Sequence, residues 1–361
     1  MKQNFYNLCL LAVVLLTLLS IAICGCEEAG IPLTEAGETQ SPDDVCVPLG
    51  VSSVTSEDAA TTRAAMTRAA MTRAATNDLN TTTRIGFYVK IPVVTPGSST
   101  PTYVEKGNKP GGYVSGSGKN WWAPDEKIWI SNLNSVMTVY APFDATQPEN
   151  KISLVAALPK ADGSNDILAG TMNVNSLTVS QTGGISVTLS HLYTCLQFTF
   201  TKNVNFETAA DSKKYTVKIN KLELIGADIY AKADYNPYTK AYSSSTTRTD
   251  VSLAISPEQT ILTGTTGTAV IKTLLIPMHQ AFTADATLKI TVNSTQGTQT
   301  VSKTLSVKIP KGTFTASQPF APGKQYNFNV KVSPKEEMEI TGVSVADWDV
   351  ALRKSDEMLV D

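Results

Sequence analysis

Short runs in which apolar and polar residues alternate strictly constrain the fold of this chain more than any other feature. In one run, Ile185, Val187 and Leu189 are separated by hydroxyl side chains. Successive side chains of a β-strand point to opposite faces, so such a run predicts a strand with one buried face. Similar runs occupy Leu196–Phe200, Leu288–Val292, Leu305–Ile309 and Tyr326–Val332. Short strands at regular spacing, without a long 3.6-residue period, predict an all-β protein built of two β-sandwiches.

The apolar phase changes inside one predicted strand. Its apolar residues are odd-numbered up to Ile219 and even-numbered from Leu222 onwards. A slip of one residue predicts a β-bulge around Asn220 or Lys221. A later turn-rich stretch, 293–297, predicts a hairpin between the strands on either side of it.

A polar connection at 203–214 is the predicted boundary between the two sandwiches. We therefore expect an N-terminal β-sandwich at 74–202 and a C-terminal β-sandwich at 203–361.

Charge and composition exclude several classes of function. The chain has 30 basic and 32 acidic residues and a formal charge of -2, so it lacks the basic field expected of a nucleic-acid-binding protein. With only two histidines, the chain is a poor candidate for a multi-histidine metal site. Its sequence also contains no phosphate-loop motif and no dinucleotide-binding fingerprint. We expect no enzyme, no metal site and no cofactor, and a structural hydrogen bond for His191.

Two clusters invite a chemical interpretation. Trp121, Trp122 and Trp129 suggest a stacking platform for glycans, or else packing in a core or at a domain junction. The adjacent Asp125 and Glu126 are a poor catalytic pair, because glycoside hydrolysis needs two carboxyl groups on the same side of a sugar site, and we expect a turn there. The acidic loop 162–166 is only weakly similar to a calcium site.

Residues 1–25 predict an export signal. Lys2 precedes an apolar run from Leu8 to Cys24, which is marginal in length for crossing a bilayer. The end of this run, Ile23-Cys24-Gly25-Cys26, resembles the lipobox of bacterial lipoproteins, and that resemblance implies cleavage before Cys26 and acylation of this residue. An ordinary secretory signal and a retained membrane anchor are the alternatives, and all three take the chain out of the cytoplasm.

The sequence of residues 26–73 predicts that this segment is a flexible tether containing one short strand. The strand is an apolar island with Val45, Val47, Leu49 and Val51 at alternate positions. It is followed by repeats of Met-Thr-Arg-Ala-Ala, which predict either a short helix or an exposed segment that offers arginines to a trypsin-like protease.

Two cysteines remain after the signal. A disulfide between Cys46 and Cys195 is one interpretation. Cys195 lies in an alternating apolar run, however, and this favours a buried thiol.

Several short motifs now follow one another in a recognisable order. They are Ile85–Val89 after the arginine repeats, Trp121–Ile130, Val136–Phe143, Asp166–Gly170, Leu189–Phe198, Leu275–Pro277, Tyr326–Val332 and Ile340–Trp348. With the lipobox and the arginine repeats, this succession resembles the fimbrillin-like lipoproteins, the subunits of type V fimbriae, over residues 26–361. The chain departs from the family pattern at Tyr140-Ala141-Pro142 and at Cys195.

The resemblance implies two tandem transthyretin-like β-sandwiches, exported as a lipidated outer-membrane precursor and destined for extracellular fimbriae. It implies that an Arg-specific protease cuts after Arg73, Arg68 or Arg63, in that order of preference, with Arg84 disfavoured because it abuts a strand. The strand carrying Val45, Val47, Leu49 and Val51 is then removed, and a strand from another fimbrial subunit replaces it.

The resemblance also implies a donor strand for the next subunit. The candidate residues are Ile340, Val343, Val345, Trp348, Val350 and Leu352. The alternative is that residues 340–348 are simply the last strand of the second sandwich. A stalk, tip or anchor position all remain open, and the competing function is a surface lipoprotein that binds glycans through its tryptophans.

Overall fold

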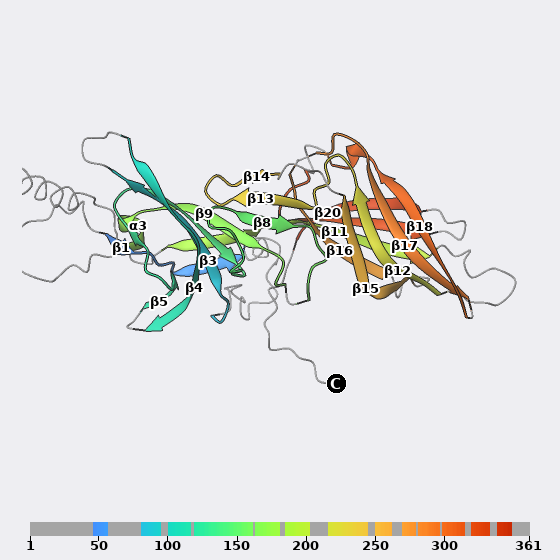
Figure 1. Cartoon of the computed structure of the whole chain (residues 1–361), viewed down its shortest axis with the longest axis horizontal. Helices are drawn as coiled ribbons and strands as arrows, with labels where there is room; N and C mark the ends of the chain where they lie inside the picture. Colours follow the sequence, from blue (N-terminus) through green and yellow to red (C-terminus); the bar gives the residue numbers. More distant parts are fainter. Residues whose placement is uncertain are drawn as a thin grey trace, which may run out of the picture.

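A computed structural model describes most of the chain beyond residue 45. The described residues are 46–56, 81–94, 100–116, 119–161, 163–180, 185–202, 216–244, 250–261, 269–278, 281–296, 298–314, 319–332 and 338–348. Cys26, Val45, the arginines at 63, 68 and 73, Val350 and Leu352 lie outside them. Figure 1 shows an elongated molecule with β-sheets at both ends. The all-β prediction is confirmed, whereas the transthyretin-like detail stays a prediction.

Strands make up nearly all of the regular structure. Their bounds are β1 Val47–Pro48, β2 Ser53–Ser56, β3 Ile85–Val93, β4 Thr102–Gly116, β5 Lys119–Pro124, β6 Trp129–Ile130, β7 Ser135–Ala141, β8 Ile152–Val155, β9 Leu168–Val174, β10 Ser186–His191, β11 Thr194–Lys202, β12 Thr216–Ile225, β13 Lys232–Asn236, β14 Ala241–Ser243, β15 Val251–Ile261, β16 Ala269–Leu275, β17 Ala286–Gln296, β18 Gln299–Ile309, β19 Lys324–Val332 and β20 Met338–Asp347. A short helix, α3, spans Ser176–Ser180, and a 3-10 turn, η3, spans Lys311–Thr313. In the described part of the chain, no helix has the length and apolar character needed to cross a membrane.

One end of the molecule is built on a seven-stranded sheet. Its order is β2-β10-β9-β7-β3-β4-β5, and a separate pair, β1 and β6, lies beside it. All neighbouring strands of the large sheet are antiparallel except β2 and β10, which run parallel. The inward side chains of these strands form one apolar core, which includes Phe87, Val139 and Leu189. The alternation seen in the sequence therefore becomes the buried face of this sheet.

The other end is a β-sandwich of two four-stranded sheets. Their orders are β16-β11-β19-β20 and β15-β12-β17-β18, and they share a second apolar core. The predicted bulge is confirmed, because the register of β12 shifts between Ile219 and Lys221 against both of its neighbours. The predicted hairpin is also present, but its strands continue to the pair Gln296 and Gln299, so the turn is shorter than the sequence suggested.

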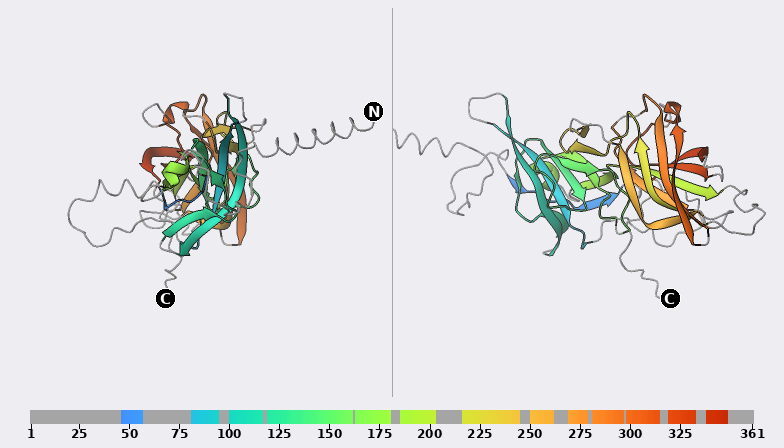
Figure 2. Two further views of the ribbon diagram at one scale, coloured as in Figure 1. Left: turned by 90° about the vertical axis from the view of Figure 1, so that its left-hand side faces the viewer. Right: turned by 45° about the vertical axis from the view of Figure 1, so that its right-hand side comes forward.

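A third apolar cluster lies between the two ends. Here a three-stranded sheet, β14-β13-β8, contributes buried residues that pack with Tyr88, Tyr140 and Trp348. Figure 1 shows this small sheet between the two larger parts, and the right-hand view of Figure 2 shows the same arrangement.

The sheets do not divide at the boundary predicted near residue 203. β11 lies before that boundary but pairs with β16 and β19, and β13 lies after it but pairs with β8. Cys195, on β11, is a free and buried thiol, so the Cys46–Cys195 disulfide considered from the sequence is absent.

Candidate functional site

The segment 46–56, which we call the leader segment, is packed into the N-terminal core. Leu49, Val51 and Val54 are 2%, 0% and 1% exposed, and Val47 packs against the same cluster as a half-buried residue. Burying a side chain of this size contributes about 1.5–3 kcal/mol. A short segment at the start of the described chain thus supplies three fully buried members of the core.

Backbone hydrogen bonds join the first half of the leader segment to β5 and β6. β1 pairs antiparallel with β6, placing Val47 opposite Ile130. The Leu49 amide donates to the Ile128 carbonyl at 2.8 Å. Val51 and Trp122 exchange hydrogen bonds in both directions, at 2.8 and 2.6 Å.

The second half of the leader segment completes the opposite edge of the sheet. The amide of Ser52 donates to the Ile185 carbonyl at 2.7 Å, and its hydroxyl donates to the same oxygen at 2.6 Å. β2 then runs parallel to β10, from the pair Ser53 and Ser186 to the pair Ser56 and Leu189. The leader segment therefore bridges the β5–β6 side and the β10 side, and we call these surfaces together the leader seat. Without the leader segment, the leader seat would present unpaired backbone groups and apolar pockets.

Three tryptophans belong to the leader seat. Trp122 is 3% exposed, and Trp129 lies opposite Pro48 in the β1–β6 pair. Gly50 lies against the ring of Trp121 so closely that an added Cβ would come within 2.2 Å of its Cε3 atom. In this state the leader segment occupies the surface that the glycan-platform interpretation needs to be open.

The adjacent carboxylates at 125 and 126 are used in ion pairs. Asp125 receives two hydrogen bonds from the Arg84 guanidinium, one of them at 3.1 Å. Glu126 accepts from the Lys109 ammonium at 2.8 Å, and this hydrogen bond lowers the pKa of the glutamate. The Arg84 carbonyl is also engaged, because it accepts from the Phe143 amide at 2.9 Å. These contacts show how the fold holds Arg84, the arginine that the sequence disfavoured as a cleavage site.

The candidate donor residues that the structure describes lie at the end of the second sandwich. Ile340, Val343 and Val345 belong to β20, which pairs antiparallel with β19. Ile340 and Val345 pack as partly buried residues against the core, while Val343 is 41% exposed. They form the last strand of the sandwich within the described residues, and a donor role for them stays a prediction.

Trp348 follows β20 and is buried in the central cluster. It is 3% exposed, and its ring stacks on that of His191 with 4.2 Å between centroids and 18° between planes. His191 Nδ1 lies 2.9 Å from Asp166 Oδ2, and both side chains are buried. This is the kind of structural hydrogen bond expected for His191.

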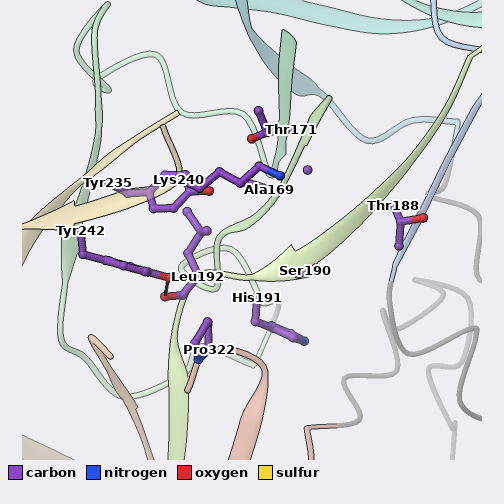
Figure 3. Close-up of a pocket in the computed structure, with 11 residues that line it drawn as sticks. Ala169, Thr171, Thr188, Ser190, His191, Leu192, Tyr235, Lys240, Tyr242 and Pro322 are labelled. Atoms are coloured by element: carbon purple, nitrogen blue, oxygen red, sulfur yellow. Dashed lines mark hydrogen bonds between the residues drawn. The ribbon is translucent and has the colours of Figure 1, made fainter. Parts of the chain in front are cut away.

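A small cavity of about 290 Å³, lined by both polar and apolar residues, lies beside His191 (Figure 3). Its wall includes Thr171, Thr188, Ser190 and Lys240, and none of the described residues that line it carries a carboxylate. Among the described residues no group of three or more His, Cys, Asp or Glu side chains could hold a metal ion. In the loop 162–166, which is weakly similar to a calcium site, the Asn165 side chain accepts a hydrogen bond from the Lys160 amide and donates one to the Leu158 carbonyl.

Sequence reasoning missed the β2 part of the leader segment. Val54 is one residue out of phase with Val51, and the serines around it look like a polar connection. The signal that would have found it is the same odd-to-even change of phase that revealed the bulge at Ile219.

Comparison with known proteins identifies one family. A model described as fimbrillin-like matches residues 72–348. A fimbrial protein from Bacteroides vulgatus is 13% identical, with 84% of this chain and 99% of that chain covered and a TM-score of 0.49. The tip fimbrial protein Mfa3 from Porphyromonas gingivalis is 10% identical, with 74% and 94% covered and a TM-score of 0.36. No curated protein matches the chain.

Proposed function

The chain belongs to the fimbrillin-like family, and from this premise we propose that it is a structural subunit of a cell-surface fimbria that polymerises by strand exchange. The observation that carries the proposal is the leader segment, which lies at the edge of the seven-stranded sheet and buries its apolar side chains in the N-terminal core. Its partners would be other fimbrial subunits, with no nucleic acid, no cofactor and no catalytic role.

Strand exchange fits the contacts of the leader segment. A strand supplied by another molecule would restore the hydrogen bonds to Ile128, Trp122 and Ile185, and alternate apolar side chains would refill the sites of Leu49 and Val51. Such a contact is head-to-tail and does not close on itself, so it propagates into a filament.

Export and processing complete the proposal. Cys26 would carry the lipid that holds the precursor at the outer membrane, and an Arg-specific protease would cut after Arg73, Arg68 or Arg63. Arg84 is a poor substrate because its side chain is held by Asp125 and the next residue begins β3. A protease needs an exposed, extended segment on both sides of the cleaved bond.

Limited proteolysis of the purified full-length precursor tests this function. A trace of trypsin should nick the chain between Arg63 and Arg73 and be followed by growth of oligomers, seen by gel filtration and as ladders on SDS gels. The control is a variant with all three arginines changed to glutamine, which should stay intact and monomeric. A nicked body that remains monomeric at high concentration, or a control that polymerises equally, would contradict the proposal.

The glycan-binding alternative makes a different prediction in the same experiment. Oligosaccharides should then change the tryptophan fluorescence of the nicked monomer. The buried state of Trp122 beneath the leader segment gives the intact precursor no support for that function.

A further inference from the structure

We propose that the cavity beside His191 binds an acidic sugar, a polyhydroxylated ligand with one carboxylate, and that Lys240 pairs with this carboxylate. The cavity lies where β9 and β10 of the N-terminal sheet meet the β13–β14 hairpin (Figure 3). Its described lining includes no residue of the leader segment. Binding of the sugar is therefore a property beyond the proposed function and does not depend on strand exchange.

The turn between β13 and β14 fixes the position of Lys240. Its φ is 60°, and it is one of two non-glycine residues with a positive φ in the described part of the chain. Glycine and asparagine adopt this conformation more readily than lysine does. The Lys240 amide donates to the Asn236 carbonyl at 2.9 Å. The Asn236 side chain accepts from the amides of Tyr238 and Thr239 at 2.9 and 3.0 Å. From this fixed turn the Lys240 side chain extends toward β9 (Figure 3).

The ammonium group of Lys240 has no hydrogen-bond or ion-pair partner among the described residues. A lysine elsewhere on the same small sheet does have one, because Lys151 pairs with Asp234 at 2.7 Å. The hydroxyl group of Ser190, on β10, likewise makes no hydrogen bond with another described residue. Two donors that line one cavity are thus available to a ligand that carries acceptor oxygens.

The charge of the cavity favours a carboxylate over a phosphate. Among the described lining residues, Lys240 is the one side chain with a permanent positive charge, and none carries a negative charge. One ammonium group balances one carboxylate. A phosphate monoester carries a charge of about -1.5 to -2 near neutral pH, and it is held best by the planar fork of an arginine, which this part of the wall lacks.

The size and the remaining chemistry of the cavity suit a single sugar unit. A volume of about 290 Å³ is at the small end of the range for ligand sites, so it admits one ring and not a chain. Tyr235 and Tyr242, whose rings lie 5.2 Å apart, line it together with Leu192 and Pro322. Such apolar surface packs against the C–H groups of a pyranose, while the donors bind its oxygens.

A fimbria built of this subunit would carry the cavity once in every copy. Repetition raises the avidity for a surface that displays many acidic sugars, even when each site binds weakly. This consequence rests on the proposed function, whereas binding of the sugar by one molecule does not.

Titration of the intact precursor with methyl β-D-glucuronide tests the inference. Binding is followed by NMR at the amides of Gly170, Thr171 and Ser190, which belong to the cavity wall. We expect saturation with a dissociation constant of the order of 1 mM, which is typical of a ligand of this size. Methyl β-D-glucoside, with a hydroxymethyl group in place of the carboxylate, and glucose 6-phosphate should both bind at least about 10-fold more weakly.

Two lysine variants assign the binding to the cavity. Lys240→Gln removes the charge and should weaken glucuronide binding at least about 10-fold. Its fold should be intact, because the Lys240 side chain has no described polar partner to lose. Lys232→Gln is the matched control and should bind as the wild type does, because Lys232 is exposed on the same hairpin but does not line the cavity.

Three results would overturn the inference. The first is the absence of any shift at these amides at ligand concentrations about 20-fold above the expected dissociation constant. The second is an equal loss of affinity in K240Q and K232Q, which would show a non-specific response to net charge. The third is binding of the glucoside or the phosphate as tight as that of the glucuronide, which would remove the pairing of Lys240 with a carboxylate.

Discussion

Replacing Leu49 by alanine should loosen the leader segment without unfolding the body of the protein. Leu49 is 2% exposed within the N-terminal core, and truncation of a buried leucine to alanine costs about 2–5 kcal/mol. At a cost of about 3 kcal/mol, the population with the leader segment detached should rise roughly 100-fold, since each 1.4 kcal/mol is a factor of ten.

Hydrogen exchange in the intact precursor measures this change. Amides of Ser186–Leu189 lie along the edge that β2 covers, so they should exchange about 100-fold faster in the variant than in the wild type. Amides of Phe198–Phe200, in the other sandwich, should be unchanged. Leu177→Ala is the matched control, because Leu177 is 65% exposed and its truncation removes little buried surface.

Two results would refute the reasoning. Equal exchange at Ser186–Leu189 in L49A and L177A would show that Leu49 does not hold the leader segment. Faster exchange in both sandwiches would show that the leader segment cannot detach without global unfolding, and would remove the physical basis for strand exchange.

Two further predictions concern the body of the protein. Gly86→Ala should lower the free energy of unfolding by at least about 1–3 kcal/mol, because the new Cβ would lie 1.9 Å from Cε1 of the buried Tyr140. Gly312→Ala is the control, because Gly312 has open space around it. Equal urea midpoints for the two variants would contradict this prediction. Burial raises the pKa of the Cys195 thiol to about 12. This thiol should therefore resist alkylation at pH 8 in the native state and react after denaturation, as followed by peptide mapping. Rapid labelling of the native protein would contradict the burial of Cys195.

The sequence predicted those features that depend on local periodicity. Alternation located β10, β11 and β19, and the phase slip located the bulge beside Ile219, because each reports which face of a strand is buried. The same signal predicted the strand with Leu49 and Val51. It did not predict Val54, since the change of phase there occurs among serines that are typical of loops.

Features that depend on distant pairing were not predictable from periodicity. β13 returns to pair with β8, which is about 80 residues away in the sequence, and this contact places strands on both sides of the expected boundary in one sheet. The adjacent Trp121 and Trp122 gave no sign of which surface they face, because an aromatic pair suits a glycan site, a core and a seat for another strand equally well. Only the partner strand decides between these roles, and that partner is the leader segment.

The position of the leader segment in the sheet gives a physical reason why a buried element could be released in the proposed strand exchange. β2 is the first strand of the seven-stranded order, and β10, β9, β7, β3, β4 and β5 remain paired with one another when it leaves. Its partner β10 is more than 130 residues away, so this contact closes a very long loop and is expected to form late in folding. β2 docks late and at an edge, and within the described residues it forms the only parallel pairing of its sheet. Its attachment therefore depends more on the burial of its side chains than on backbone hydrogen bonds to the other strands. The apolar sites of Leu49, Val51 and Val54 should therefore set the affinity of any replacement strand, with the main-chain hydrogen bonds setting its alignment.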